Sequence, residues 1–261
     1  MTSSVQDLFS LAGSCAVVIG GAGKIGLPMS TALAEAGARV YVASRAMATA
    51  HPEIVRLRSG GLDVHGIELD QSDEKMVLAV LGRITAEAKT PDILVNCGVE
   101  RPMRRYFDDT VEAWDRSMAV NSRGLFVSCR AFGKAMASQK SGSIINVASI
   151  YGLVAPDPQT YEGTDVNTEP DYPYTKGGMI MFSKYLASYL ARDGVRVNCI
   201  APGGLFNNQL EPFYSNYVRK VPLHRMASRD DLKGVTVFLA SAASSYITGA
   251  VIPVDGGLTI R

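Results

Sequence analysis

Short apolar runs rich in β-branched residues alternate along the chain with longer segments of helical period. Several of the short runs are apolar on both faces, as strands covered by helices on two sides are. The runs that we interpret as strands are Cys15–Gly20, Arg39–Ser44, Val64–Asp70, Asp92–Asn96, Ser143–Ala148, Val195–Ala201 and Ala250–Val254. The helical patterns between them are Ile25–Ala36, Gln71–Ala88, Thr110–Ser138, Tyr172–Arg192 and Arg229–Ala240. This alternation predicts an α/β fold with a doubly wound, seven-stranded parallel sheet and helices on both faces.

Two stretches depart from the regular alternation. Residues 153–171 hold three prolines and five acidic residues without a clear period, and residues 205–222 follow a Pro-Gly-Gly turn and are rich in Asn and aromatic residues. Long irregular segments in a compact domain are usually functional or disordered, and we expect both to lie over the carboxyl edge of the sheet, where ligands bind. Since no repeat or charged linker interrupts the pattern, residues 1–261 are expected to form a single domain.

Composition and charge narrow the function classes. With 26 Lys and Arg against 25 Asp and Glu, the formal net charge is +1, which argues against a broad nucleic-acid or membrane surface. The first residues lack the pattern of a signal peptide. Residues 234–254 are uncharged and long enough to cross a bilayer, but their Ser, Thr, Gly and Pro residues favour a buried helix, a turn and a buried strand. We therefore expect a cytoplasmic protein.

The four cysteines give no sign of a metal centre. Cys15, Cys97, Cys129 and Cys199 are widely spaced, and no Cys-x-x-Cys pair or Cys/His cluster occurs. This spacing predicts neither a disulfide framework nor a metal site. We expect reduced thiols, most of them in the core.

A glycine-rich loop follows the first predicted strand. Gly20, Gly23 and Gly26 permit a tight turn, a close approach to a phosphate and tight helix–strand packing. Glycine spacing alone is equally compatible with a plain turn. Here the loop directly follows a strand and begins a helix whose first amides would face a phosphate, which favours a dinucleotide site.

The end of the second strand bears on the choice of dinucleotide. It reads Ser44-Arg45 where an acidic residue would bind a ribose 2′-hydroxyl, and Lys24 lies in the glycine loop. Since a guanidinium binds phosphate well, we favour NADP over NAD, the alternative being that both cations are solvated surface charges. Asp70, after the third strand, is expected to accept a hydrogen bond from adenine, to cap the next helix, or both.

Tyr172 and Lys176 are the main candidates for chemistry. Their i, i+4 spacing puts a phenol and an ammonium on one helical face, and the ammonium favours the phenolate. Such a tyrosine can exchange a proton with an alcohol, although the same spacing also occurs by chance on amphipathic helices. Ser149 follows a predicted strand at the ligand edge. Asn121 lies inside a helical pattern that disfavours it locally, so a polar role is plausible beside the alternative of a surface position.

Taken together, these residues resemble the short-chain dehydrogenase/reductase family, in its compact single-domain subgroup with a Rossmann fold. The resemblance rests on the glycine loop, Asp70, Leu94-Val-Asn96-Cys, Asn121, Ser149, Tyr172/Lys176, Asn198-Cys-Ile-Ala-Pro202-Gly203 and Ile252-Pro-Val-Asp255-Gly256-Gly257. It implies that Tyr172 is the general acid/base, that Lys176 holds the nicotinamide ribose and tunes Tyr172, that Ser149 binds the reacting oxygen, and that Asn121 holds a water of the proton relay. It also implies a homotetramer.

The resemblance assigns a cofactor site as well. Asn96 would lie by the adenosine ribose, and the backbone after Pro202-Gly203, near Leu205, would contact the carboxamide. The residues expected to bind the cofactor are Gly20, Gly23, Lys24, Ile25, Gly26, Ser44, Arg45, Asp70, Gln71, Asn96, Cys97, Gly98, Tyr172, Lys176, Pro202, Gly203 and Leu205. The chain departs from the subgroup at Ile19, usually Thr, at Lys24, usually Gly, and at Cys97-Gly98-Val99, usually Asn-Ala-Gly.

The substrate is expected to be polar. Any of four arginines near the ligand edge is a candidate for reading an anionic substrate, with surface solubility as the alternative: Arg101, Arg104, Arg105 and Arg123. The two irregular segments offer Gln159, Tyr161, Glu162, Asp165, Asn167, Asn207, Asn208 and Gln209. This rim favours a small-molecule sugar, sugar acid or polyol as substrate of an oxidoreductase that interconverts a secondary alcohol and a ketone. The alternatives are a non-catalytic NAD(P)-binding regulator and a sugar epimerase or dehydratase on the same fold.

Overall fold

A parallel sheet forms the middle layer of the structure, a computed structural model that describes residues 3–47 and 51–260. Its strands are β1 (Cys15–Ile19), β2 (Arg39–Ser44), β3 (Val64–Glu68), β4 (Ile93–Asn96), β5 (Gly142–Val147), β6 (Val195–Pro202) and β7 (Val251–Val254). The seven strands follow the order β3-β2-β1-β4-β5-β6-β7, and every neighbouring pair is parallel. The predicted doubly wound, single-domain Rossmann sheet is confirmed.

The strand order reverses beside β1, and this reversal creates the ligand crevice. Ile19 pairs with Ala43 of β2 on one side and with Asn96 of β4 on the other. The Gly20 amide then donates to the Ala43 carbonyl (2.8 Å). The chain segments after these three strands therefore leave the sheet side by side, as at the switch point where open α/β sheets bind ligands.

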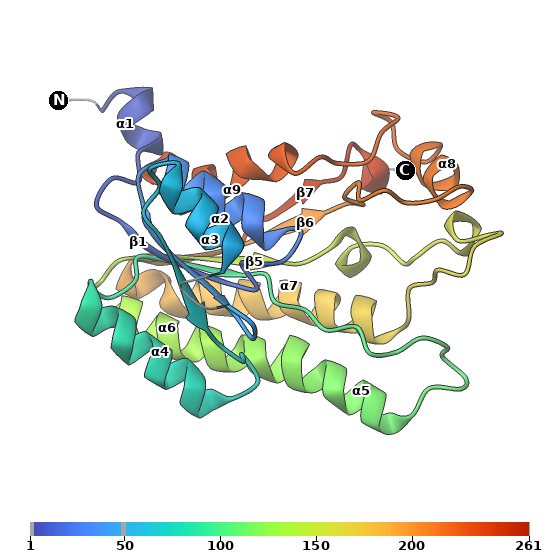
Figure 1. Ribbon diagram of the computed structural model, residues 1–261, viewed down its shortest axis with the longest axis horizontal. Helices are drawn as coiled ribbons and strands as arrows, with labels where there is room; N and C mark the ends of the chain where they lie inside the picture. Colours follow the sequence, from blue (N-terminus) through green and yellow to red (C-terminus); the bar gives the residue numbers. More distant parts are fainter. Residues whose placement is uncertain (1–2, 48–50, 261) are drawn as a thin grey trace.

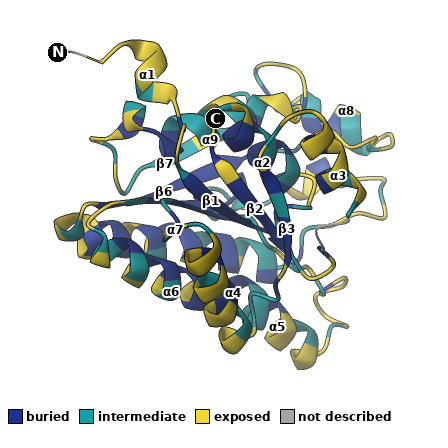
Figure 2. Cartoon of the chain, turned by 60° about the vertical axis from the view of Figure 1, so that its left-hand side comes forward, coloured by how far each residue is buried: buried dark blue, intermediate teal, exposed yellow. Residues whose placement is uncertain are grey.

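Helices cover both faces of the sheet (Figure 1). On one side lie α2 (Gly26–Glu35), α3 (Pro52–Ser59) and α9 (Lys233–Ala240), and on the other α4 (Glu74–Glu87), α6 (Leu125–Ser138) and α7 (Asp171–Leu190). Along β1, Val17 and Ile19 face the second layer, whereas Ala16 and Val18 face the first. Figure 2 shows the resulting sandwich, with buried strands between helices that expose their outer sides.

Three short helices are absent from the sequence expectation: α1 (Val5–Phe9), α3 and α8 (Phe213–Val218). α8 lies within residues 205–222, which were expected to be irregular. Residues 153–171 contain one 3₁₀ turn, Pro158–Thr160, before α7 begins. The helix predicted over residues 110–138 is in fact two, α5 (Val111–Met118) and α6, joined by a π-helical turn at Ala119–Gly124.

The uncharged stretch 234–254 folds as a helix, a turn and a strand. It contains most of α9, a 3₁₀ turn at Ala242–Ser244 and β7. The expectation of a buried strand is wrong here, because β7 is the last strand of the sheet and has only β6 beside it, so its side chains stay partly exposed. Within the part of the chain that the structure describes, no helix has the length and apolar character needed to cross a bilayer.

The cysteines are free thiols. Cys15, Cys129 and Cys199 are buried, and Cys97 is partly buried. Burial raises the pKa of the Cys129 thiol to about 12 and those of Cys15, Cys97 and Cys199 to about 11. The residues described contain no cluster of three or more His, Cys, Asp or Glu side chains arranged to hold a metal ion.

Candidate active site

The Tyr172 and Lys176 side chains lie together at the start of α7. Lys176 is 4% exposed, and its Nζ donates to the Val147 carbonyl at the end of β5 (2.6 Å). The same Nζ lies 5.7 Å from the centroid of the Tyr172 ring. The ammonium is therefore fixed to the sheet edge beside the phenol, as the i, i+4 spacing predicts.

Ser149 joins this pair from the segment that follows β5. It is buried, and its Oγ accepts a hydrogen bond from the Tyr151 amide (3.1 Å) at the start of a 3₁₀ turn. Ser149 and Tyr172 line the same cavity of about 170 Å³. Ile25 of the glycine loop and Gly203 after β6 line it too, so this cavity adjoins the crevice at the strand ends.

Asn121 occupies the π-helical turn and is 3% exposed. Its Oδ1 accepts from the Glu100 amide (2.8 Å), while its Nδ2 donates to the Glu100 carbonyl (2.7 Å) and to Ser117 Oγ (3.0 Å). The side chain thus holds the segment that follows β4. π-Helical turns are rare and frequently occur at functional sites.

The glycine loop lines a second cavity, of about 400 Å³. Gly20 has a φ of +76°, and a Cβ there would lie 2.5 Å from the Gly98 amide nitrogen. A Cβ on Gly26 would lie 2.2 Å from the Gly20 carbonyl oxygen. Side chains at these positions would collide with the backbone, so glycine permits the tight turn that forms a backbone cradle suited to the diphosphate of a dinucleotide.

Other predicted cofactor residues surround this cradle. Those that line the 400 Å³ cavity are Gly20, Gly23, Ser44, Arg45, Asp70, Gln71, Cys97 and Gly98. Gln71 Nε2 donates to the Val120 carbonyl (2.8 Å), which connects the cavity wall to the π-helical turn. Lys24 and Gly26 lie outside the lining, Lys24 on the exposed surface and Gly26 buried beneath the loop.

Asp70 is held by its own turn. Its Oδ1 accepts from the Ser72 amide (2.8 Å) and the Ser72 hydroxyl (2.7 Å), and the hydroxyl contact is the main cause that lowers the pKa of Asp70. The residue that caps α4 is Asp73, which accepts from the Lys75 and Met76 amides. The expectation that Asp70 caps this helix is therefore wrong, because the helix begins one turn later than the pattern indicated.

Arg45 has a partner that sequence reasoning missed. Its Nη1 lies 3.2 Å from Glu100 Oε2. The other carboxylate oxygen, Glu100 Oε1, forms an ion pair with Arg116 Nε at 2.8 Å. Glu100 comes from the segment after β4, far from Arg45 in sequence. Only the convergence of the strand ends brings the two together, so no local pattern could have identified the pair.

Asn96 does not line the crevice with its side chain. It is buried in β4, and its Nδ2 donates to Asn146 Oδ1 (2.8 Å) and to Cys129 Sγ (3.3 Å). Asn146 Nδ2 in turn donates to Ser183 Oγ of α7 (2.7 Å). This buried polar chain connects β4, β5 and α7 beneath the catalytic cavity.

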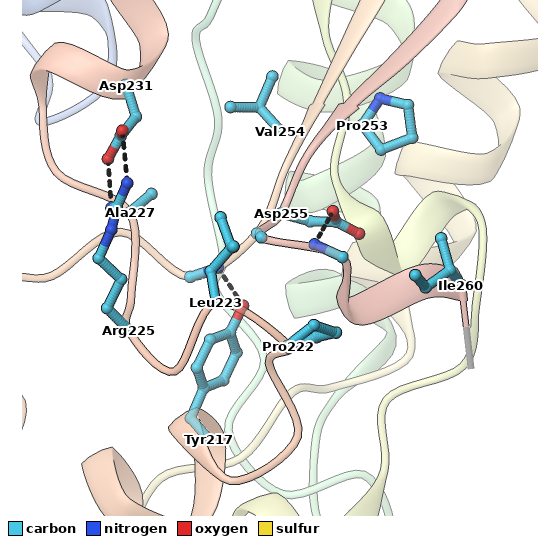
Figure 3. A pocket seen from close by; sticks show the side chains of 14 residues that line it. Tyr217, Pro222, Leu223, Arg225, Ala227, Asp231, Pro253, Val254, Asp255 and Ile260 are labelled. Atoms are coloured by element: carbon cyan, nitrogen blue, oxygen red, sulfur yellow. Dashed lines mark hydrogen bonds and ion pairs between the residues drawn. The ribbon is translucent and has the colours of Figure 1, made fainter.

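The loop after β6 separates the catalytic cavity from a larger one. Pro202 and Gly203 line the catalytic cavity, whereas Leu205 pairs with Ala227 in an isolated bridge. Tyr217 lines both cavities, and its hydroxyl accepts from the Gly204 amide. Figure 3 shows the larger cavity, of about 500 Å³, beneath the C-terminal turn. Neither Ser149 nor Tyr172 lines it, so the smaller cavity is the candidate for catalysis.

The four candidate arginines are placed differently. Arg101 lines the catalytic cavity, and its Cζ lies 4.5 Å from the Tyr172 ring centroid. Arg104 and Arg105 line an outer groove formed with residues 158–169, and Arg123 is exposed on the π-helical turn. Tyr161, Asn167 and Gln209 of the irregular segments also reach the catalytic cavity, whereas Asn207 and Asn208 stay exposed.

Known proteins share this architecture. A family model described as Enoyl-(Acyl carrier protein) reductase matches residues 20–259. A galactitol 2-dehydrogenase of Rhizobium johnstonii is 34% identical, over 98% of this chain and 99% of that protein. A gluconate 5-dehydrogenase of Burkholderia cenocepacia, solved with NADP and tartrate, is 29% identical with a TM-score of 0.87, over 99% of this chain and all of that one.

A short-chain dehydrogenase of Leptospira borgpetersenii, solved with bound NAD⁺, is 32% identical with a TM-score of 0.87. The alignment covers 99% of this chain and 97% of that one. The likeness thus extends over the glycine loop, the catalytic cavity and the C-terminal strand. The chain belongs to the short-chain dehydrogenase/reductase family, whose members bind a nicotinamide cofactor.

Proposed function

We propose that this chain is an NAD(P)-dependent oxidoreductase that interconverts a secondary alcohol and a ketone on a small polyhydroxylated substrate. The observation that carries the proposal is the meeting of Ser149, Tyr172 and Lys176 at one sheet edge, in and beside a cavity that adjoins the glycine-loop crevice. An acid/base group, a hydrogen-bonding hydroxyl and a dinucleotide cradle are the parts that this reaction needs.

Each residue of the site has its own role in the proposed reaction. The glycine loop and the residues around Gly98 would hold a nicotinamide cofactor, which would supply the hydride chemistry at the alcohol carbon. Tyr172 accepts the hydroxyl proton in oxidation and donates it in reduction. Ser149 hydrogen-bonds the reacting oxygen, and Lys176 fixes positive charge beside the phenol. Asn121 holds the Glu100 segment and, as the resemblance implies, a water of the proton relay.

We propose NADP as the preferred cofactor. Ser44 at the end of β2 leaves the 2′-position free of a carboxylate, and Arg45 lines the same cavity. Structural relatives exist with each dinucleotide, so the preference rests on these two residues. The carboxylate of Glu100, which contacts Arg45, limits how strongly a 2′-phosphate is favoured.

The substrate class rests on the cavity wall. The polar residues Asn167, Thr168 and Gln209 line it beside several tyrosines, with their side chains held by neighbouring residues. Relatives named for galactitol and gluconate act on polyhydroxylated compounds, which supports a sugar, sugar acid or polyol. The match to the family model establishes membership of the family and does not identify a substrate for this chain.

The decisive experiment pairs two tyrosine variants on α7. Y172F is expected to lower kcat by about 10²–10⁴-fold while cofactor affinity is retained, because only the proton-transfer group is lost. Y174F is the control, since Tyr174 is exposed and its ring packs at a tilt against Trp114 outside the cavity. A non-catalytic regulator would show no turnover to lose, and an epimerase would release no reduced cofactor.

We also propose a cytoplasmic homotetramer. α6 and α7 expose Phe126, Met181, Tyr185 and Tyr189, an apolar surface suited to contact with a second copy. Light scattering of the purified protein tests this assembly, and a monomeric mass would refute it.

A further inference from the structure

Arg101 is the single charged residue among the described residues that line the catalytic cavity. The other polar groups of the wall are neutral hydroxyls and amides, such as Asn167, Thr168 and Gln209. A guanidinium keeps its proton at any physiological pH. The wall of the cavity therefore carries one permanent positive charge, that of Arg101.

That place is next to the reacting group. The Arg101 guanidinium lies over the face of the Tyr172 ring, with Cζ 4.5 Å from the ring centroid. Its Nη2 makes two long hydrogen bonds, both 3.4 Å, to the Asn167 carbonyl and to Thr168 Oγ1. In the part of the chain that the structure describes, no other hydrogen bond or ion pair engages the guanidinium, so donors remain for a ligand.

Two acids from the segments around Arg101 are engaged by other residues. Glu100, adjacent in sequence, takes Arg45 and Arg116. Glu169 is buried and accepts from Asn167 Nδ2 (3.2 Å). Among residues 3–47 and 51–260, none of the ion pairs involves Arg101. The exposed guanidinium over the tyrosine ring therefore keeps donors that an anionic group of the substrate can use.

We propose that Arg101 binds a carboxylate of the substrate, close to the carbon that exchanges the hydride, and that the substrate is a polyhydroxylated carboxylic acid. This inference rests on the proposed function, since it names the substrate class for the same cavity. A carboxylate matches the planar fork of a guanidinium with two parallel hydrogen bonds.

The test compares an aldonate, the alditol with the same carbon skeleton and the corresponding sugar phosphate. The wild-type enzyme is expected to prefer the aldonate. In R101Q, kcat/KM for the aldonate is expected to fall about 30-fold or more, mainly through KM, so that the ratio of aldonate to alditol activity collapses. R101K, which keeps the charge but loses the fork, is expected to restore part of the ratio. R105Q is the control, because the exposed Arg105 lines the outer groove, whereas the Arg104 guanidinium donates to the Arg101 carbonyl (2.8 Å).

Binding without turnover separates this inference from the proposed function. In a Y172F background, which retains the ring beneath the guanidinium, calorimetry with cofactor bound is expected to show aldonate binding that the added R101Q change weakens. Equal loss of aldonate and alditol activity in R101Q, or a wild-type preference for the alditol or the phosphate, would overturn the carboxylate assignment alone. Absence of hydride transfer to or from every polyhydroxylated compound would overturn the proposed function and the inference with it.

Discussion

The Asn121 side chain hydrogen-bonds both the amide and the carbonyl of Glu100. It accepts from the amide at 2.8 Å and donates to the carbonyl at 2.7 Å. Both residues lie beside the crevice, one on the π-helical turn and the other just after β4. The position of Arg101, the next residue, therefore depends on a side chain in another layer of the molecule.

Replacing Asn121 by Ala should release this segment. Two partly buried main-chain groups would lose their partners, so the free energy of unfolding is expected to fall by about 1–2 kcal/mol, together with kcat. Urea denaturation and steady-state kinetics measure both. S122A is the matched control from the same turn, because the Ser122 hydroxyl makes only a 3.6 Å contact with Met118 Sδ. Equal stability of the two variants would contradict the prediction.

We expect Glu100 to weaken the preference for NADP over NAD. In E100Q the Arg45 guanidinium loses its carboxylate partner, and the repulsion of a 2′-phosphate disappears. KM for NADP⁺ is then expected to fall about two- to fivefold, while KM for NAD⁺ changes little. E53Q breaks the exposed Glu53–Arg56 pair on α3 and serves as the control. An unchanged ratio of the two KM values in E100Q would show that Arg45 does not face the phosphate.

Two glycine-to-alanine variants, one in the glycine loop and one in α4, test whether the loop needs glycine to bind the cofactor. G20A places a Cβ 2.5 Å from the Gly98 amide nitrogen in a left-handed conformation, so we expect loss of cofactor affinity and lower stability. G82A meets nothing within 4 Å inside α4 and is expected to stabilise the fold by about 0.5–1 kcal/mol. Cofactor titration by fluorescence and urea unfolding distinguish the two variants, and normal cofactor binding by G20A would refute the cradle.

The Arg225–Asp231 pair predicts a pH dependence of stability. Arg225 is the main cause that lowers the pKa of Asp231 below its ordinary value. Because the folded pKa lies below the unfolded one, the ionised carboxylate stabilises the fold above about pH 4, and this contribution is lost as the pH falls through the folded value. The difference in unfolding free energy between wild type and D231N should be about 1 kcal/mol at pH 7 and vanish in acid.

The neighbouring acid provides the comparison for that measurement. Asp230 is 84% exposed at its side chain and lies 3.5 Å from Lys233. D230N is expected to change stability little at either pH. A D231N effect of the same size at pH 7 and pH 3 would contradict the linkage.

The sequence predicted the sheet because several of its strands are apolar on both faces and are separated by segments of helical period. Gly37, with a φ of +102°, follows α2 as expected of a helix-ending glycine. The short helices were missed because five to eight residues show too little of a helical period. The π-helical turn was missed because one additional residue leaves the apolar spacing of residues 110–138 almost unchanged.

Within the site, local motifs were predictable and long-range pairs were not. The Tyr172–Lys176 spacing and the glycine loop each lie within a few residues of sequence. The contacts of Arg45 with Glu100 and of Arg101 with Tyr172 depend on how loops from different strands converge. Four arginines were equivalent candidates in the sequence, and only their placement relative to the cavity distinguishes Arg101 from the others.

The π-helical turn also sets where the chain can tolerate changes of length. Asn121 lies between two helices that form one rod, so adding or removing a residue in α5 would rotate its side chain by about 100° and break its grip on Glu100. Residues 153–171, which have little regular structure, can accept insertions without such a rotation. Point substitutions cannot reveal this contrast, whereas single-residue insertions along the chain would map it directly.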